Sequence, residues 1–107
     1  MTRKWLTLYL SRSVSRVMLQ DLQAILPAEA VKIFTNDLDD VRYATVECVQ
    51  AETTCALIAS AIIVWRQLGH IHLLLYTQGE VQRQITDATQ FELFTLLKNN
   101  RAALRLA

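Results

Sequence analysis

The hydrophobic positions of this chain change their period several times, and each change predicts a different element. Residues 5–10 alternate, with Leu6, Leu8 and Leu10 on one face and Trp5, Thr7 and Tyr9 on the other. This period of two predicts a strand covered on at least one side. Residues 13–26 follow a helical period instead, with apolar side chains at Val14, Val17, Met18, Leu22 and Ile25. The chain therefore begins with a strand followed by an amphipathic helix.

The ends of this first helix and one polar exception within it can also be predicted. Ser11 or Ser13 can cap its first turn, and Pro27 marks its end, because proline disfavours helical geometry in the residue before it. Asp21 is the exception, since it lies near the apolar stripe on the helical wheel. We expect its carboxylate at the rim of the core, paired with a lysine or arginine.

The rest of the chain alternates between strand and helix signals. Strands are predicted over 31–34, 41–49, 71–76 and 81–85, and helices over 52–68 and 87–98. Turns are expected over 36–40 and 77–80, with a capping box at Asp87 and Gln90. The residues after Asn100 look like a tail.

This order of elements predicts the fold class. A chain of 107 residues has the usual length of one domain, so we expect a single domain over 1–107. The elements predict an α+β two-layer sandwich, in which a four- to five-stranded mixed or antiparallel sheet carries two to three helices mainly on one face.

The helix predicted over 52–68 is unusually apolar and has two different sides. On a helical wheel its large side chains gather on one arc, formed by Leu57, Ile58, Ala61, Ile62, Val64, Trp65 and Leu68. The opposite side carries the small residues Ala56, Ala59 and Ser60 around one large apolar residue, Ile63. This side either faces solvent or contacts a neighbouring helix, which belongs to the same chain or to a second copy.

Composition and charge favour a protein partner over a membrane or a polyanion. The chain is 52% hydrophobic and 20% charged, so it has more apolar surface than one small core needs. Its net charge of +1 gives no long-range attraction to nucleic acid. Thirteen uncharged residues separate Glu52 from Arg66, too few for a membrane span of about twenty. We expect a cytoplasmic protein whose Cys48 and Cys55 stay reduced.

Few residues offer catalytic or metal-binding chemistry. His70 and His72 are two apart in a predicted strand, so both would project from one sheet face, but no third ligand can be assigned beyond the possibilities Cys48 and Glu47. Cys55 lies near a helix start, where a thiolate can be stabilised, yet an apolar run follows it and a buried, inert thiol is expected. We therefore predict no catalytic residue, no metal and no cofactor.

A nucleic-acid site has some support. Trp5 and Tyr9 lie on one strand face, and Arg12 and Arg16 lie one helical turn apart. Aromatic side chains on a sheet with basic neighbours can stack bases. The near-neutral charge and the lack of a ribonucleoprotein-type motif favour instead a strand covered on both faces, so nucleic acid is not the expected partner.

One stretch resembles a known bacterial family. It comprises the helix end Val64-Trp65-Arg66-Gln67-Leu68, then residues 69–76 (GHIHLLLY), then Gly79-Glu80-Val81. In sequence layout, residues 5–85 resemble the effector-associated constant components of prokaryotic conflict systems, which have a Trp-bearing helix followed by a β-hairpin with a glycine at its turn. The chain departs from them by lacking the Gly/Met/Gly-type turn before the middle strand and by adding the helix over 87–98. The resemblance implies a non-enzymatic accessory module that couples to an effector or sensor.

These observations lead to three hypotheses. The leading one is a non-enzymatic protein–protein interaction module, a small bacterial accessory protein able to form a homodimer through Ala56, Ala59, Ser60 and Ile63. The second is a small metal- or cysteine-dependent enzyme that uses His70, His72 and Cys55. The third is a weak nucleic-acid-binding module that uses Trp5, Tyr9, Arg12 and Arg16.

Overall fold

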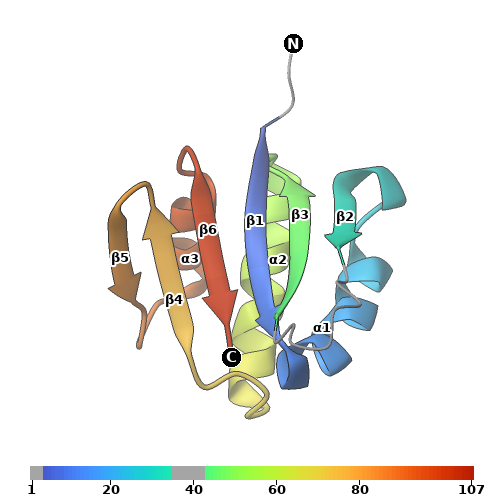
Figure 1. Cartoon of the computed structure of the whole chain (residues 1–107), viewed down its shortest axis with the longest axis horizontal. Coiled ribbons are helices and arrows are strands. Elements are labelled where there is room, and N and C mark those ends of the chain that lie inside the picture. Colours follow the sequence, from blue (N-terminus) through green and yellow to red (C-terminus); the bar gives the residue numbers. More distant parts are fainter. Residues whose placement is uncertain (1–3, 35–42) are drawn as a thin grey trace.

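A computed structural model describes residues 4–34 and 43–107, which form a six-stranded sheet with three helices (Figure 1). The elements are β1 (Trp5–Ser11), α1 (Arg12–Ile25), a short 3₁₀ helix (Ala28–Ala30), β2 (Val31–Phe34), β3 (Tyr43–Val49), α2 (Glu52–Gln67), β4 (Leu74–Gln78), β5 (Val81–Gln84), α3 (Gln90–Leu97) and β6 (Ala102–Leu106). The predicted α+β class is confirmed, but the sheet has six strands rather than four or five.

The sheet is mixed, with the strand order β2-β3-β1-β6-β4-β5. β1 is antiparallel to β3 on one side and parallel to β6 on the other. β4 and β5 form an antiparallel hairpin whose turn begins at Gly79, a residue with φ of 59°. Each helix therefore connects two strands that run in the same direction and are not neighbours, as crossover connections do.

The strand β6 is the main correction to the prediction, which treated this segment as a tail. β6 lies between β1 and β4, near the middle of the sheet (Figure 1). Thr7 pairs with Ala103 and Tyr76 pairs with Leu104, so β6 joins the two halves of the sheet. The last helix and the last strand therefore complete the sheet.

Other predicted boundaries also change. The strand expected over 71–76 begins at Leu74, because the segment before it is irregular. The capping box is formed by Thr89 and Glu92, not by Asp87 and Gln90, and it starts α3 at Gln90. Ser11 caps α1 as predicted, with its Oγ accepting from the Val14 N–H at 3.3 Å. The turn expected over 36–40 lies outside the described residues.

One core lies between the helices and one face of the sheet. Leu6, Leu8 and Leu10 are fully buried, whereas the residues that alternate with them in β1 are half-buried. α1 contributes Met18 and Leu22 to the same core. Across residues 4–34 and 43–107, each helix is too short or too polar to span a bilayer.

Asp21 has a different partner from the one that the sequence suggested. Its Oδ2 accepts a hydrogen bond of 2.6 Å from Nε1 of Trp65, which lies on α2. Trp65 is almost completely buried, so this carboxylate supplies the acceptor that an indole N–H at the rim of a core needs. The bond links α1 directly to α2.

Candidate functional site

Helix α2 is rotated about its axis relative to the prediction. Its buried side is formed by Thr54, Cys55, Ile58, Ala59, Ile62 and Trp65. Val64 and Leu68 were expected in the core, but they are 48% and 64% exposed. The apolar run therefore does not all face the sheet, and part of it lies on the surface of the molecule.

This rotation changes the surface that was predicted to meet another chain. Ala59 is fully buried, so it cannot contact a partner, and Ile63 is half-buried against the core. The neighbour on this side of α2 is α3 of the same chain. Lys98, at the end of α3, forms an ion pair of 3.1 Å with Glu52 at the start of α2. Ala56 is exposed and Ser60 is half-buried, so these two predicted residues remain available.

We define the helical patch as Ala56, Leu57, Ser60 and Val64 of α2 together with Phe91 and Phe94 of α3. Phe91 is 74% exposed, the most exposed of the large hydrophobic side chains in the described chain. Its ring centre lies 6.5 Å from that of Phe94, and these rings line a pocket of about 360 Å³ with Ala56 and Gln90. Because α2 has no charged residue from Thr53 to Trp65, its part of the patch is uncharged.

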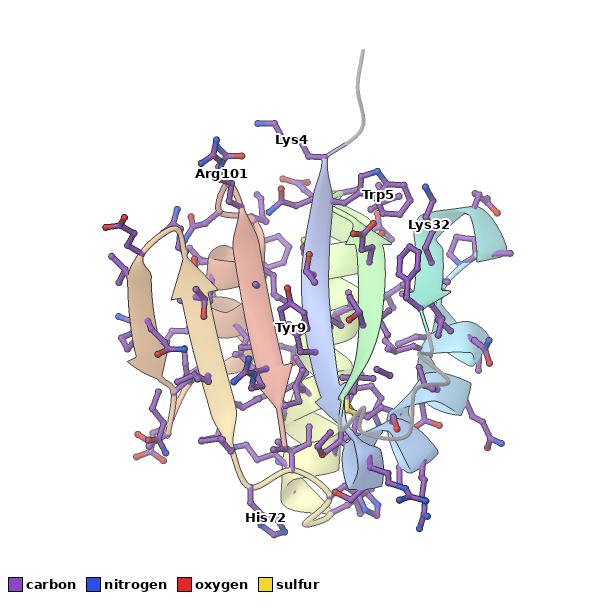
Figure 2. All side chains as sticks on the ribbon, in the orientation of Figure 1. Lys4, Trp5, Tyr9, Lys32, His72 and Arg101 are labelled. Carbon is purple, nitrogen blue, oxygen red and sulfur yellow. The ribbon has the colours of Figure 1, made fainter. Side chains whose placement is uncertain are left out.

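The opposite side of the molecule is the outer face of the sheet, which we define by the side chains that point away from the helices. Within the described residues no element covers this face, so the expectation that β1 is covered on both sides is corrected (Figure 2). Trp5 and Tyr9 of β1 lie on it, as does Phe34 of β2, which is 51% exposed.

Strand register places charged side chains around these rings. Glu47 of β3 is paired with Thr7 on one side and Lys32 on the other. Lys32 Nζ lies 4.6 Å from the centre of the Trp5 ring, and Arg105 of β6 lies 6.0 Å from that of Tyr9. Both distances are within the range of cation–π attraction. Sequence reasoning found the two rings, but it missed Lys32, Phe34 and Arg105.

The predicted histidine pair does not form a site. His70 and His72 lie in the irregular segment between α2 and β4, not on a common strand face, and both are exposed. The backbone N–H of His72 donates to the Ala107 carbonyl at 2.8 Å. In the described part of the chain, no group of three or more His, Cys, Asp or Glu side chains could hold a metal ion.

The two cysteines are buried thiols. Burial raises the pKa of Cys48 from its ordinary value of 9.0 to about 12, and the nearby Cys55 adds to the shift. Burial also raises the pKa of Cys55, although Lys98 opposes this shift. Both side chains are fully buried, so neither is poised as a nucleophile.

This burial predicts how the thiols react. At pH 8 we expect a disulfide reagent such as 5,5′-dithiobis(2-nitrobenzoate) to modify neither Cys48 nor Cys55 in the folded protein, and both after guanidinium unfolding. Since the pKa of Cys48 is raised from 9.0 to about 12 in the folded protein, the free energy of unfolding should be unaffected by this thiol well below pH 9 and should fall between about pH 9 and pH 12. The raised pKa of Cys55 acts in the same direction. Fast reaction of the folded protein at pH 8 would contradict this assignment.

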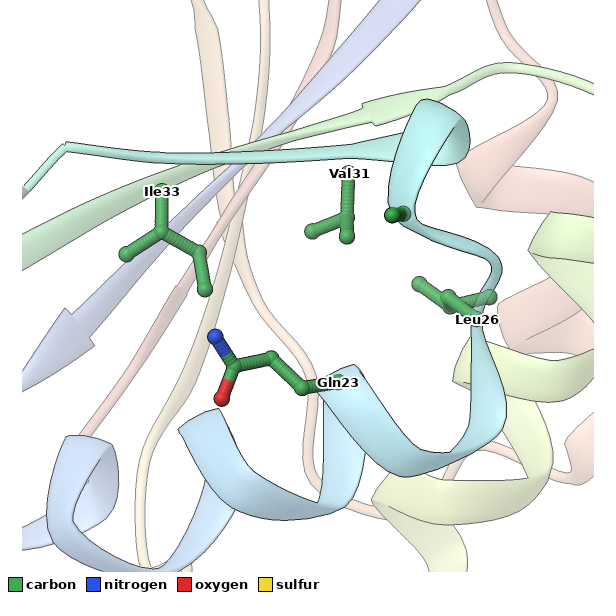
Figure 3. A pocket seen from close by; sticks show the side chains of 5 residues that line it. Gln23, Leu26, Val31 and Ile33 are labelled. Carbon is green, nitrogen blue, oxygen red and sulfur yellow. The ribbon is translucent and has the colours of Figure 1, made fainter.

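A second pocket lies between α1 and β2 (Figure 3). It has a volume of about 350 Å³ and is lined by Gln23, Leu26, Ala28, Val31 and Ile33. The Gln23 amide projects into it from α1, facing the side chains of β2 (Figure 3). These lining residues include no titratable group, so the pocket can accommodate an apolar group but offers no acid–base or nucleophilic chemistry.

Comparison of the chain with family models, with curated proteins and with solved structures gave no match. The two surfaces, the helical patch and the outer face, are therefore interpreted from their own chemistry.

Proposed function

We propose that this chain is a non-enzymatic protein–protein interaction module that forms a homodimer through the helical patch. The observation that carries the proposal is the exposure of Phe91 (74%) and Val64 (48%) beside an uncharged face of α2. Exposed hydrophobic residues are ordinary when they are scattered singly, but here Phe91 lines an apolar pocket together with Phe94 and Ala56 of α2. Interface cores are typically rich in aromatic side chains and poor in charge.

The shape of the patch suits packing of one α2 against another. Ala56 and Ser60 are small, so a second backbone can approach α2 closely, while Val64 and Phe91 project as knobs. A two-fold dimer uses the same patch on both subunits, and the patch contains both features that such a contact requires. Burying Phe91 and Val64 favours association, since each large apolar side chain contributes about 1.5–3 kcal/mol when fully buried.

The enzymatic hypothesis has weaker support. It relied on His70, His72 and Cys55, of which the two histidines are exposed in an irregular segment and the thiol is buried in the core. A nucleophilic cysteine needs access to substrate and a lowered pKa, whereas burial raises the pKa of Cys55. An interaction role requires neither.

The resemblance to effector-associated constant components fits the same proposal. The Trp-bearing helix and the hairpin that follows it correspond to α2, β4 and β5, with Gly79 at the hairpin turn. We propose on this basis a bacterial, cytoplasmic accessory protein of a conflict system. In that setting a dimer would present two copies of the module to an effector or sensor.

Sedimentation velocity at micromolar concentration tests the dimer. We expect the native chain to sediment as a dimer and Val64→Lys to sediment as a monomer, because the substitution places a charge in the apolar contact. Val81→Lys is the matched control, since Val81 is 66% exposed on the edge strand β5, outside the patch, and this variant should stay dimeric. A monomeric native chain, or equal effects of the two substitutions, would exclude the helical patch as the interface.

A further inference from the structure

We propose that the outer face of the sheet is a binding site for single-stranded RNA. This site is distinct from the helical patch, because it lies on the opposite side of the sheet (Figure 2). It also differs from the sequence hypothesis, since Arg12 and Arg16 belong to α1 in the helical layer. The cations that accompany Trp5 and Tyr9 are instead Lys32 and Arg105.

The spacing of the three aromatic rings suits separate, unpaired bases. Trp5 and Tyr9 are four residues apart on β1, a distance of about 13 Å along a strand. Phe34 and Tyr9 are both aligned with Thr45, so they lie two strands apart, about 10 Å across the sheet. These rings are too far apart to stack on one another, so each would receive a separate base. Trp5 and Tyr9 are half-buried, with Lys32 and Arg105 over their rings, so a base that stacks there displaces the cation towards its phosphate. Only unpaired bases can stack in this way.

Three cations lie near the Trp5 end of this face, where Glu47 is also found. Lys4 precedes Trp5 in the chain, Lys32 lies over its ring, and Arg101 stands at the start of β6 at the same end of the sheet (Figure 2). Arg105 lies further along, beside Tyr9. A base that stacks on Trp5 brings its phosphate within reach of Lys32, so this cation can pair with a polyanion although the whole chain carries only +1.

One acidic residue distinguishes RNA from DNA. Glu47 lies among the rings, between Thr7 and Lys32, where it would repel a phosphate but can accept a hydrogen bond from a ribose 2′-hydroxyl. DNA lacks that donor.

Fluorescence anisotropy with a labelled single-stranded RNA of about 12 nucleotides tests the proposal at low ionic strength. We expect Trp5→Leu and Tyr9→Leu each to raise Kd by about fivefold or more, which is the low end of the loss for one stacked base. Lys32→Gln should reduce the slope of log K against log salt by about 0.7, the value for one phosphate contact on a single strand. RNA should also quench the fluorescence of Trp5, which Trp5→Leu removes.

Controls on the helical layer separate this site from general effects. Arg12→Gln and Arg16→Gln each remove a charge on α1, outside both the outer face and the helical patch, so both should leave Kd within a factor of two of the native value (about 0.4 kcal/mol). Arg101→Gly is a further test of the outer face and not a control. It removes a cation at a residue with φ of 59°, a conformation that glycine adopts freely, so it should weaken RNA binding without disturbing the fold. Circular dichroism verifies that each variant is folded.

Four results would overturn the proposal. The first is a lack of binding at low ionic strength, and the second is binding of duplex RNA, or of DNA of the same sequence, as tightly as single-stranded RNA. The third is a Kd for RNA that neither Trp5→Leu nor Lys32→Gln changes. The fourth is a change of oligomeric state in Trp5→Leu. The last result would assign the outer face to a second copy. The dimer test uses other residues on the other side of the sheet, so either proposal can fail alone.

Discussion

Leu104→Ala should lower the free energy of unfolding by about 2–5 kcal/mol, the cost of removing a large buried side chain. Leu104 is 1% exposed and lies near the middle of the sheet. It is aligned with Leu8 of β1 on one side and with Tyr76 of β4 on the other, and both of these are buried. A cavity at this position would loosen the junction between the two halves of the sheet. Urea denaturation followed by circular dichroism measures the loss.

Leu75→Ala is the matched control for this prediction. Leu75 lies on the neighbouring strand β4, aligned with Arg105 of β6, and is half-buried on the outer face. The same truncation there leaves no enclosed cavity, so we expect a loss of roughly 1 kcal/mol or less. Equal losses in the two variants would mean that β6 does not occupy the centre of the sheet.

The missed strand β6 illustrates which parts of the fold the sequence could predict. Period and turn signals located the first five strands and the three helices, with shifted bounds for β4 and α3, because each of these patterns is local. Residues 102–106 also alternate, with Arg105 between Leu104 and Leu106, but the segment is short and rich in alanine. Its main support comes from pairing with β1, a strand near the other end of the chain. That pairing has no local signature.

The orientation of α2 could not be predicted for a related reason. A helix that is apolar on almost every side fits several rotations about its axis equally well. The position of α3 selects one of them, because α3 packs on the side that carries Glu52 and Ala56. Of the four residues predicted for an interface, Ala56 is exposed, Ser60 and Ile63 are half-buried and Ala59 is buried, whereas Val64, expected in the core, is 48% exposed.

The outer face was predictable only in part. Alternation along β1 placed Trp5 and Tyr9 together, since residues two and four apart share a face. Lys32 and Arg105 come from other strands, and only the register between strands brings them to those rings. The arginines chosen from the sequence were near in the chain, but they lie on α1. Sequence proximity was therefore a poor guide to which cations accompany the rings.

The hydrogen bond between Asp21 and Trp65 leads to the second large prediction, because it links α1 to α2 through one acceptor. Asp21→Ala should lower the free energy of unfolding by about 1–3 kcal/mol, since it removes the charged acceptor of a partly buried indole N–H. Asp21→Asn keeps a side-chain oxygen at this position and should recover most of the loss. Denaturation monitored by tryptophan fluorescence gives each value.

A double-mutant cycle decides whether this bond, rather than a general effect of the substitution, holds α1 against α2. Trp65→Phe removes the N–H but keeps an aromatic ring in the core, so it is destabilising by itself. Once it is present, Asp21→Ala should cost little, because no donor remains to be left unpaired. The coupling should then be about 1 kcal/mol or more. If Asp21→Ala costs the same with either ring at position 65, the carboxylate acts through some other contact, and the two helices are held together by their apolar side chains alone.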